Sequence, residues 1–122
     1  MPRKKVLVVE DEKPMANALR LKLESSGFDT VTVFGGREAI KSINEQKFDV
    51  ILLDLIMPEV DGFKVLETLR EQRVQTPVIV LSNLGQPEDI ERAKKFGARD
   101  YCVKSNTTLL EIVQKVRALL KA

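Results

Sequence analysis

Apolar residues in this chain fall into two kinds of segment that alternate along the sequence. Short runs rich in β-branched residues recur at 6–9, 30–33, 50–53, 78–81 and 100–103. The first, third and fourth runs are apolar without alternation, which is typical of strands covered on both faces. The second run alternates Thr with Val and the fifth mixes polar and apolar residues, so we predict that these two strands lie at the edges of a sheet.

The segments between these runs carry apolar residues at helical spacing. Met15, Leu19 and Leu23 mark one helix, and the stretch 109–120 repeats apolar residues at i, i+3, i+4, i+7 and i+11. Five short strands that alternate with five helices are typical of an α/β fold, in which a parallel sheet carries helices on both faces.

Local signals at the expected helix ends support this assignment. Gly27 and Gly97 stand where two helices should stop, and glycine is the common residue in a left-handed helix cap. Thr108 and Glu111 have the spacing of a capping box at the start of the last helix. The sequence shows no internal repeat, low-complexity tract or linker.

Length and composition limit the classes of protein that the chain can represent. With 122 residues, 43% of them hydrophobic, it suits one packed domain, and we expect a single domain over 1–122 without an output domain. A net charge of +2 gives no indication of a nucleic-acid or membrane surface. The apolar runs are far shorter than the roughly 20 residues of a membrane span, so we expect a soluble, cytoplasmic protein.

Two residue types narrow the chemistry further. The chain has no His, which excludes Ser-His-Asp or Cys-His catalysis, His-ligated metals and a phosphohistidine formed on this chain. Its single Cys, Cys102, permits no internal disulfide and no zinc cluster. Any chemistry must therefore depend on carboxylates, Lys, hydroxyl groups and the backbone.

Polar residues follow directly after most of the expected strands. The acidic run 10–12 follows the first strand, Asp54 the third, Ser82 ends the fourth, and Lys104 follows the fifth. Because the carboxyl ends of parallel strands meet at one edge of the sheet, we expect these residues to converge there. A carboxylate such as Asp54 at the end of a buried strand is costly unless it is paired or bound to a cation.

This constellation suits a hard divalent cation and a phosphoryl group. Glu10, Asp11 and Asp54 offer carboxylate oxygens, which Mg²⁺ and also Mn²⁺ accept as ligands. Asp54 is then placed to act as a nucleophile toward a phosphoryl donor. Lys104 and Ser82 are placed to pair with the phosphoryl oxygens. Catalysis of this kind is mostly positioning and charge neutralisation.

Four segments carry a resemblance to a known family. The chain resembles the receiver domains of two-component response regulators, in particular the single-domain chemotaxis-type regulators, at 6–12, 52–62, 78–82 and 97–104. Each segment alone is a weak signal, but all four occur in order, each at the end of an expected strand. The resemblance implies a doubly wound, flavodoxin-like (βα)5 fold with strand order 2-1-3-4-5.

The resemblance implies roles residue by residue. It makes Asp54 the phosphoacceptor and Lys104 the partner of the phosphoryl group. It makes Asp11 a direct Mg²⁺ ligand, Glu10 a ligand through water, and the backbone carbonyl of Ile56 a further ligand.

Two further residues match the switch of the family. The resemblance makes Ser82 the hydroxyl that turns toward the phosphoryl group and Tyr101 the aromatic residue that follows it. An ordinary half-buried aromatic on an edge strand explains Tyr101 equally well.

The resemblance also implies partners and an output. A sensor histidine kinase or a phosphotransfer protein donates the phosphoryl group, and the face made by the fourth helix, the fifth strand and the fifth helix then changes its affinity for a downstream protein. Such a chain is a signalling module rather than a turnover enzyme. The resemblance is compatible with a monomer or with a dimer promoted by phosphorylation.

One departure from the family pattern and one further feature matter. The family usually has Pro, joined by a cis peptide, after the lysine, and this chain has Ser105 there, which leaves both cis and trans open. Ile56 lies two residues after Asp54, and Leu84 lies two residues after Ser82. These positions flank the path of hydrolytic water in the family. Neither side chain orients a water molecule, so we predict slow self-dephosphorylation.

Three alternatives compete with this interpretation. A pseudo-receiver would bind partners without phosphorylation, although the acids, the acceptor, the hydroxyl and the lysine are all present. A flavin-binding electron carrier would need a hydroxyl- and glycine-rich phosphate loop where this chain has the acidic run 10–12. An aspartyl phosphatase usually has a second acid where this chain has Ile56.

Overall fold

The computed structural model describes residues 3–121 of the chain. Within this range five strands alternate with five α-helices, and a short 3₁₀ helix precedes the last α-helix. The elements are β1 (Lys5–Val9), α1 (Lys13–Ser25), β2 (Asp29–Val33), α2 (Gly36–Glu45), β3 (Val50–Leu53), α3 (Gly62–Glu71), β4 (Val78–Ser82), α4 (Pro87–Lys95), β5 (Asp100–Val103), η1 (Lys104–Asn106) and α5 (Leu109–Leu120).

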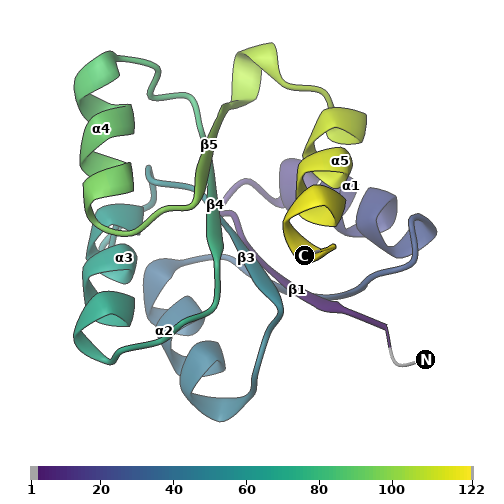
Figure 1. The fold of residues 1–122 in the computed structure, drawn as a ribbon, viewed down its shortest axis with the longest axis horizontal. Coiled ribbons are helices and arrows are strands. Elements are labelled where there is room, and N and C mark those ends of the chain that lie inside the picture. Colours follow the sequence, from purple (N-terminus) through teal and green to yellow (C-terminus); the bar gives the residue numbers. More distant parts are fainter. Residues whose placement is uncertain (1–2, 122) are drawn as a thin grey trace.

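The strands form one parallel sheet in the order β2-β1-β3-β4-β5 (Figure 1). This order confirms the doubly wound α/β fold, and it confirms that the second and fifth strands lie at the edges of the sheet. The burial patterns agree, because every residue of β3 and β4 is buried whereas most residues of β2 and β5 are only partly buried.

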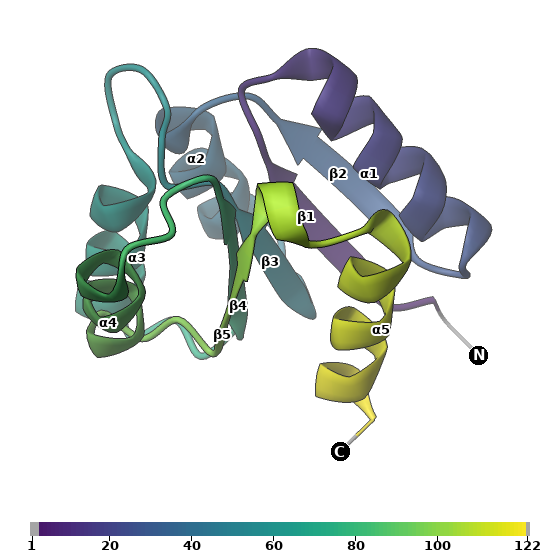
Figure 2. The same ribbon diagram turned by 90° about the horizontal axis from the view of Figure 1, so that it is seen from above.

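Helices α1 and α5 cover one face of the sheet, and helices α2, α3 and α4 cover the other (Figures 1 and 2). Alternate residues of the strands supply the two layers of core. In β1, Val6 and Val8 pack with residues of α1 and α5, and Leu7 and Val9 pack with residues of α2, α3 and α4. Both faces of the central strands are therefore buried, which explains their unbroken apolar sequences.

The predicted helix ends are confirmed. Gly27 and Gly97 have φ of +100° and +106°, a conformation that glycine adopts without steric cost after a helix. Thr108 caps α5, with its hydroxyl accepting from the backbone N–H of Glu111 while the Glu111 carboxylate accepts from the backbone N–H of Thr108.

The segment after β5 has a trans backbone. No peptide bond within residues 3–121 is cis, so the Lys104–Ser105 bond is trans, and Lys104 begins the 3₁₀ helix η1. Between residues 3 and 121, none of the helices has the length and apolarity that a bilayer span requires.

Candidate functional site

The register of the central strands brings Glu10 and Asp54 together. Val9 of β1 pairs with Leu53 of β3, so the next residue of each strand emerges at the same edge of the sheet. The backbone N–H of Asp54 also donates to the carbonyl of Val9 at 3.0 Å. Both carboxylates are enclosed, with Glu10 1% and Asp54 4% exposed. The predicted convergence of acids at this edge is present in the structure.

Lys104 places one cation among these acids. Its Nζ lies 2.5 Å from Oε1 of Glu10, 2.8 Å from Oδ2 of Asp54 and 3.3 Å from Oε1 of Glu12. Such charge-assisted contacts satisfy buried carboxylates that would otherwise be costly. Three carboxylates still surround one ammonium group, so the site keeps an excess of negative charge.

Burial and pairing change the acidity of two of these groups. Burial raises the pKa of Glu10 to about 7, against the lowering effect of the Lys104 hydrogen bond. Burial alone would lower the pKa of Lys104, but its hydrogen bonds with Asp54 and Glu10 and their charges hold the pKa above its usual value. Lys104 therefore carries its positive charge at neutral pH.

Asp54 is held from both sides. Its Oδ1 accepts a hydrogen bond from the backbone N–H of Ile56 at 3.1 Å, and its Oδ2 accepts from Lys104 at 2.8 Å. Helix α3 begins directly against its backbone, since a Cβ at Gly62 would lie 2.4 Å from the carbonyl oxygen of Asp54. Only glycine permits this close approach, which fixes the loop after β3.

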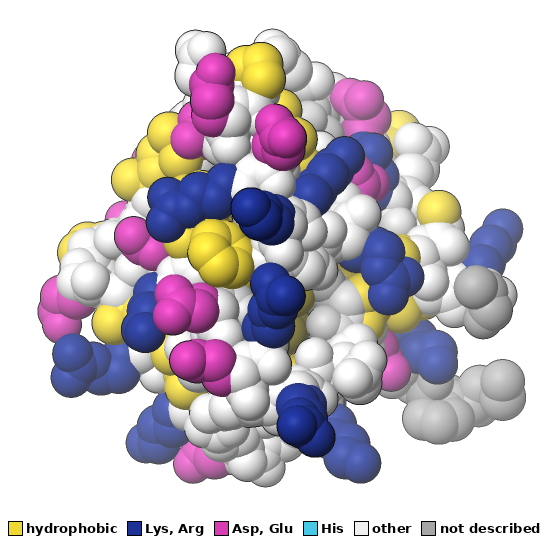
Figure 3. All heavy atoms as spheres, turned by 60° about the vertical axis from the view of Figure 1, so that its left-hand side comes forward, with side chains coloured by type: hydrophobic (Ala, Val, Ile, Leu, Met, Phe, Trp, Pro, Cys, Tyr) yellow, Lys and Arg dark blue, Asp and Glu magenta, His cyan; other side chains and the backbone are white. Residues whose placement is uncertain are grey.

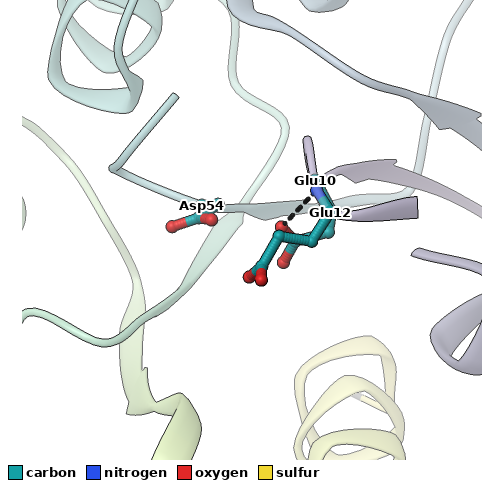
Figure 4. A group of neighbouring side chains, drawn as sticks. All are labelled: Glu10, Glu12 and Asp54. Atoms are coloured by element: carbon teal, nitrogen blue, oxygen red, sulfur yellow. Dashed lines mark hydrogen bonds between the residues drawn. The ribbon is translucent and has the colours of Figure 1, made fainter. Parts of the chain in front are cut away.

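A cavity of about 280 Å³ opens beside these groups and is lined by Asp11, Glu12, Asp54, Ile56, Asn83 and Lys104. Asp11 therefore lies beside the cavity, and its role as a direct ligand stays a prediction. The carboxylate oxygens that lie within 4.8 Å of one another, however, belong to Glu10, Glu12 and Asp54 (Figure 4). Glu12 was not among the ligands expected from sequence; its only signal there was its place in the acidic run.

Ser82 and Tyr101 meet at the backbone of Leu84. The Ser82 hydroxyl accepts from the Leu84 N–H at 3.3 Å, and the Tyr101 hydroxyl donates to the Leu84 carbonyl at 2.5 Å. Ser82 is fully buried at the end of β4, and Tyr101 is half-buried on β5, where burial raises its pKa. The two residues expected to form a switch are thus connected through one residue of the β4–α4 loop.

The donor set fits a hard divalent cation. Oε1 of Glu10 is buried beside the Lys104 ammonium, 2.5 Å away, and within residues 3–121 it has no further hydrogen-bond partner. A buried carboxylate oxygen next to two further acids and an open cavity is the environment in which proteins hold Mg²⁺ through oxygen ligands and water.

Known proteins share both the sequence and the fold. The profile of the "Response regulator receiver domain" family matches residues 6–117. The alkaline phosphatase synthesis transcriptional regulatory protein PhoP of Bacillus subtilis is 36% identical over 97% of this chain and 49% of its own length. The cell cycle response regulator CtrA of Brucella ovis is 40% identical over 82% of this chain and 43% of its own length.

Solved receiver structures superpose on nearly the whole chain. The receiver domain of Francisella response regulator 1452 has a TM-score of 0.93 and 39% identity, with 98% of both chains covered. The Vibrio cholerae chemotaxis protein CheY4 has a TM-score of 0.90 and 28% identity, with 98% of this chain and 100% of the other covered.

The chain spans about half the length of the curated relatives that it matches, and the expectation of a single domain stays a prediction. The family profile, the two regulators and the two structures agree with the site geometry. The chain therefore belongs to the family of response regulator receiver domains, the signalling modules of two-component systems.

Proposed function

We propose that this chain is a phosphoacceptor receiver, in which a partner histidine kinase or phosphotransfer protein phosphorylates Asp54. The observation that carries the proposal is the position of the Asp54 carboxylate. It is nearly buried, fixed between the N–H of Ile56 and the ammonium of Lys104, and lines an open cavity. A nucleophile oriented in this way needs little reorganisation before attack.

In the proposed step a carboxylate oxygen of Asp54 forms a bond to phosphorus. The phosphorus–nitrogen bond of the donor phosphohistidine breaks, and its electron pair returns to the imidazole nitrogen. Lys104, already 2.8 Å from Asp54, pairs with the phosphoryl oxygens that arrive there. The Ser82 hydroxyl turns from Leu84 to donate to the same group.

Receiver domains typically bind Mg²⁺, and the acidic residues here are compatible with it. We assign the binding to Asp11 and Asp54, to Glu10 through water and to the backbone carbonyl of Ile56, with Mn²⁺ as a substitute. When bound, the ion supplies charge neutralisation for the phosphoryl oxygens. Glu12, which is exposed, adds a further carboxylate to the lining of the cavity.

The output follows from the contacts of Leu84. If Ser82 turns toward the phosphoryl group, its hydrogen bond with Leu84 is lost, and the loop that also receives the Tyr101 hydroxyl is freed to rearrange. We assign the resulting change to the face of α4, β5 and α5, which binds a downstream protein, or a second copy of the chain, in the cytoplasm. Response regulators of this family act with histidine kinases and downstream targets.

The decisive experiment incubates the protein with Mg²⁺ and acetyl phosphate and then measures its intact mass. We expect a phosphoryl adduct that is labile to hydroxylamine, absent after chelation, and absent from Asp54→Asn. The matched control is Asp29→Asn, an exposed aspartate on β2 that should keep the adduct.

If neither acetyl phosphate nor beryllofluoride reacts with the wild-type site in the presence of Mg²⁺, the phosphoacceptor function is wrong. The pseudo-receiver alternative would then replace it.

The phosphorylated form should lose its phosphoryl group slowly. Ile56 lines the cavity with a half-exposed hydrocarbon side chain, and Leu84 is likewise apolar, so neither orients an attacking water. We expect a lifetime well beyond seconds for the isolated protein, followed by intact mass after removal of the donor. Ile56→Asn, which supplies an amide, should shorten it, and decay of the wild type within seconds would contradict the prediction.

A further inference from the structure

Helix α4 is attached to the domain by little apolar burial. Of its nine residues, Pro87 to Lys95, only Ala93 is buried. The surface that includes α3 and α4 shows basic and acidic side chains interspersed with small apolar areas (Figure 3). A helix with so little apolar contact needs other interactions to hold its position.

Arg92 supplies one such interaction. Its guanidinium lies 3.9 Å from the ring centre of Phe63 on α3 and 5.7 Å from that of Phe96, which follows α4. Phe63 is only 7% exposed and belongs to the core layer beneath α3 and α4, so the Arg92 side chain covers a core residue. Stacking of a planar guanidinium on an aromatic face combines cation–π attraction with van der Waals contact.

A second arginine also contacts the last turn of α4, which contains Arg92. Arg70 of α3 donates through Nη1 to the backbone carbonyl of Lys95 at 3.1 Å. This bond satisfies a carbonyl in the last turn of α4, where helices leave their carbonyls without internal partners. Two arginine contacts thus join the last turn of α4 to α3, one at Phe63 in the first turn of α3 and one at Arg70 in its last turn.

The Arg92 contact is also connected to Asp54 through the packing of the first turn of α3. Phe63 follows Gly62, and a Cβ at Gly62 would lie 2.4 Å from the Asp54 carbonyl oxygen and 2.6 Å from the Cα of Leu55. The N–H of Gly62 donates to the carbonyl of Leu55 at 3.0 Å. A movement of the Asp54 backbone therefore moves the first turn of α3 and with it the ring under Arg92.

We propose that Arg92, stacked on Phe63 and Phe96, is a positioning residue that latches α4 to α3 and so opposes the displacement of α4 when Asp54 is modified. This inference rests on the proposed function, since it assigns one restraint on the same switch. The contacts of Gly62, Phe63 and Arg92 connect Asp54 to α4. They are separate from the hydrogen bonds that connect Ser82 to Tyr101 through Leu84.

The first test measures amide hydrogen exchange of α4 in the full chain without ligand. Arg92→Ala should raise exchange of the α4 amides about two- to five-fold, the range expected from an exposed cation–π contact. Lys94→Ala is the matched control, because it makes a similar change of helix propensity at an exposed position of the same helix. Equal exchange in the two variants would overturn the proposal.

A double substitution tests whether Phe63 is the residue on which Arg92 acts. In Phe63→Leu, which keeps an apolar side chain but removes the ring, Arg92→Ala should have little additional effect on α4 exchange. Far-UV circular dichroism confirms that each variant is folded. Additive effects of the two substitutions would overturn the assigned contact.

The last test asks whether the latch is coupled to Asp54. Removing a contact that opposes the displacement of α4 increases the fraction of protein that is competent to bind. Arg92→Ala should therefore bind beryllofluoride with Mg²⁺ about two- to five-fold more tightly than Lys94→Ala, the same factor as for exchange. Unchanged or weaker binding would overturn the coupling even where exchange is raised. If the wild type binds no beryllofluoride, the proposed function fails, and the exchange comparison alone still decides whether Arg92 restrains α4.

Discussion

Helices α4 and α5 lie on either side of the same edge strand, yet they are attached in different ways. Helix α5 buries Ile112, Val113 and Val116 and begins with a capping box. Helix α4 buries Ala93 alone, and its N-cap residue Gln86 makes no side-chain hydrogen bond to the helix. Apolar burial and local capping thus fix α5, whereas side chains of α3 and the neighbouring loops hold α4.

This difference has a consequence for the proposed output face. A face that changes its affinity needs one part that moves and another that stays in place as a reference. Elements with few buried apolar contacts open locally at low free-energy cost, and switching elements are drawn from them. The contrast therefore assigns the movable part of the face to α4 and the fixed part to α5.

The largest expected difference comes from the same substitution made in each helix. Ile112→Ala in α5 should lower the free energy of unfolding by about 2–5 kcal/mol, because Ile112 is fully buried. Ile90→Ala in α4, where the side chain is only half-buried, should lower it by about 1 kcal/mol or less. Urea unfolding followed by circular dichroism measures both, since the chain has no Trp. Equal losses of unfolding free energy would contradict the difference in apolar burial between α4 and α5.

Helix caps provide the next comparison. Thr108→Ala removes the hydroxyl that accepts from the Glu111 N–H and should cost about 1 kcal/mol of stability. Gln86→Ala should cost almost nothing, because Gln86 makes no side-chain cap bond. The same unfolding experiment compares them. A loss at Gln86 as large as that at Thr108 would show that α4 is capped in solution in a way that resembles α5.

The strands and the capping box could be predicted because their causes are local. The run 50–53 is apolar throughout since its strand is buried on both faces, and the box needs only Thr108 and Glu111 at the right spacing. Strand-end positions likewise predicted that Asp54 and Lys104 would meet, since the parallel register of β3, β4 and β5 determines which residues share an edge of the sheet.

Other features depend on tertiary contacts between distant residues. Glu12 joins the acids near Asp54 because of how its side chain lies relative to Lys104, and no spacing rule separates it from Asp11. The stacking of Arg92 on Phe63 requires the last turn of α4 to lie against α3. The peptide after Lys104 is trans, and the sequence alone left both isomers open.

A surface ion pair joins α5 to the edge strand and should contribute less than the cap. Nζ of Lys115 lies 3.0 Å from Oδ2 of Asp100, and both side chains are about two-fifths exposed, at 42% and 39%. A double-mutant cycle with Lys115→Ala and Asp100→Ala should give a coupling of about 0.2–1 kcal/mol that decreases with added salt. A larger, salt-independent coupling would mean that the ion pair, and not apolar burial alone, anchors α5.

The smallest expected effect is the pH dependence of the α5 cap. Backbone and side-chain hydrogen bonds from Thr108 lower the pKa of Glu111 below its ordinary value of 4.5. Because the folded pKa is lower than the unfolded one, the ionised carboxylate stabilises the fold above the ordinary pKa, and this stabilisation is lost as pH falls through the lowered value. The stability advantage of wild type over Glu111→Gln should therefore be constant near neutral pH and disappear in acid.

Unfolding curves at a series of pH values measure this advantage, with Glu91→Gln, an exposed mid-helix position of α4, as the control. An advantage that persists at low pH would mean that the geometry of the box, rather than the charge of Glu111, distinguishes the start of α5 from that of α4.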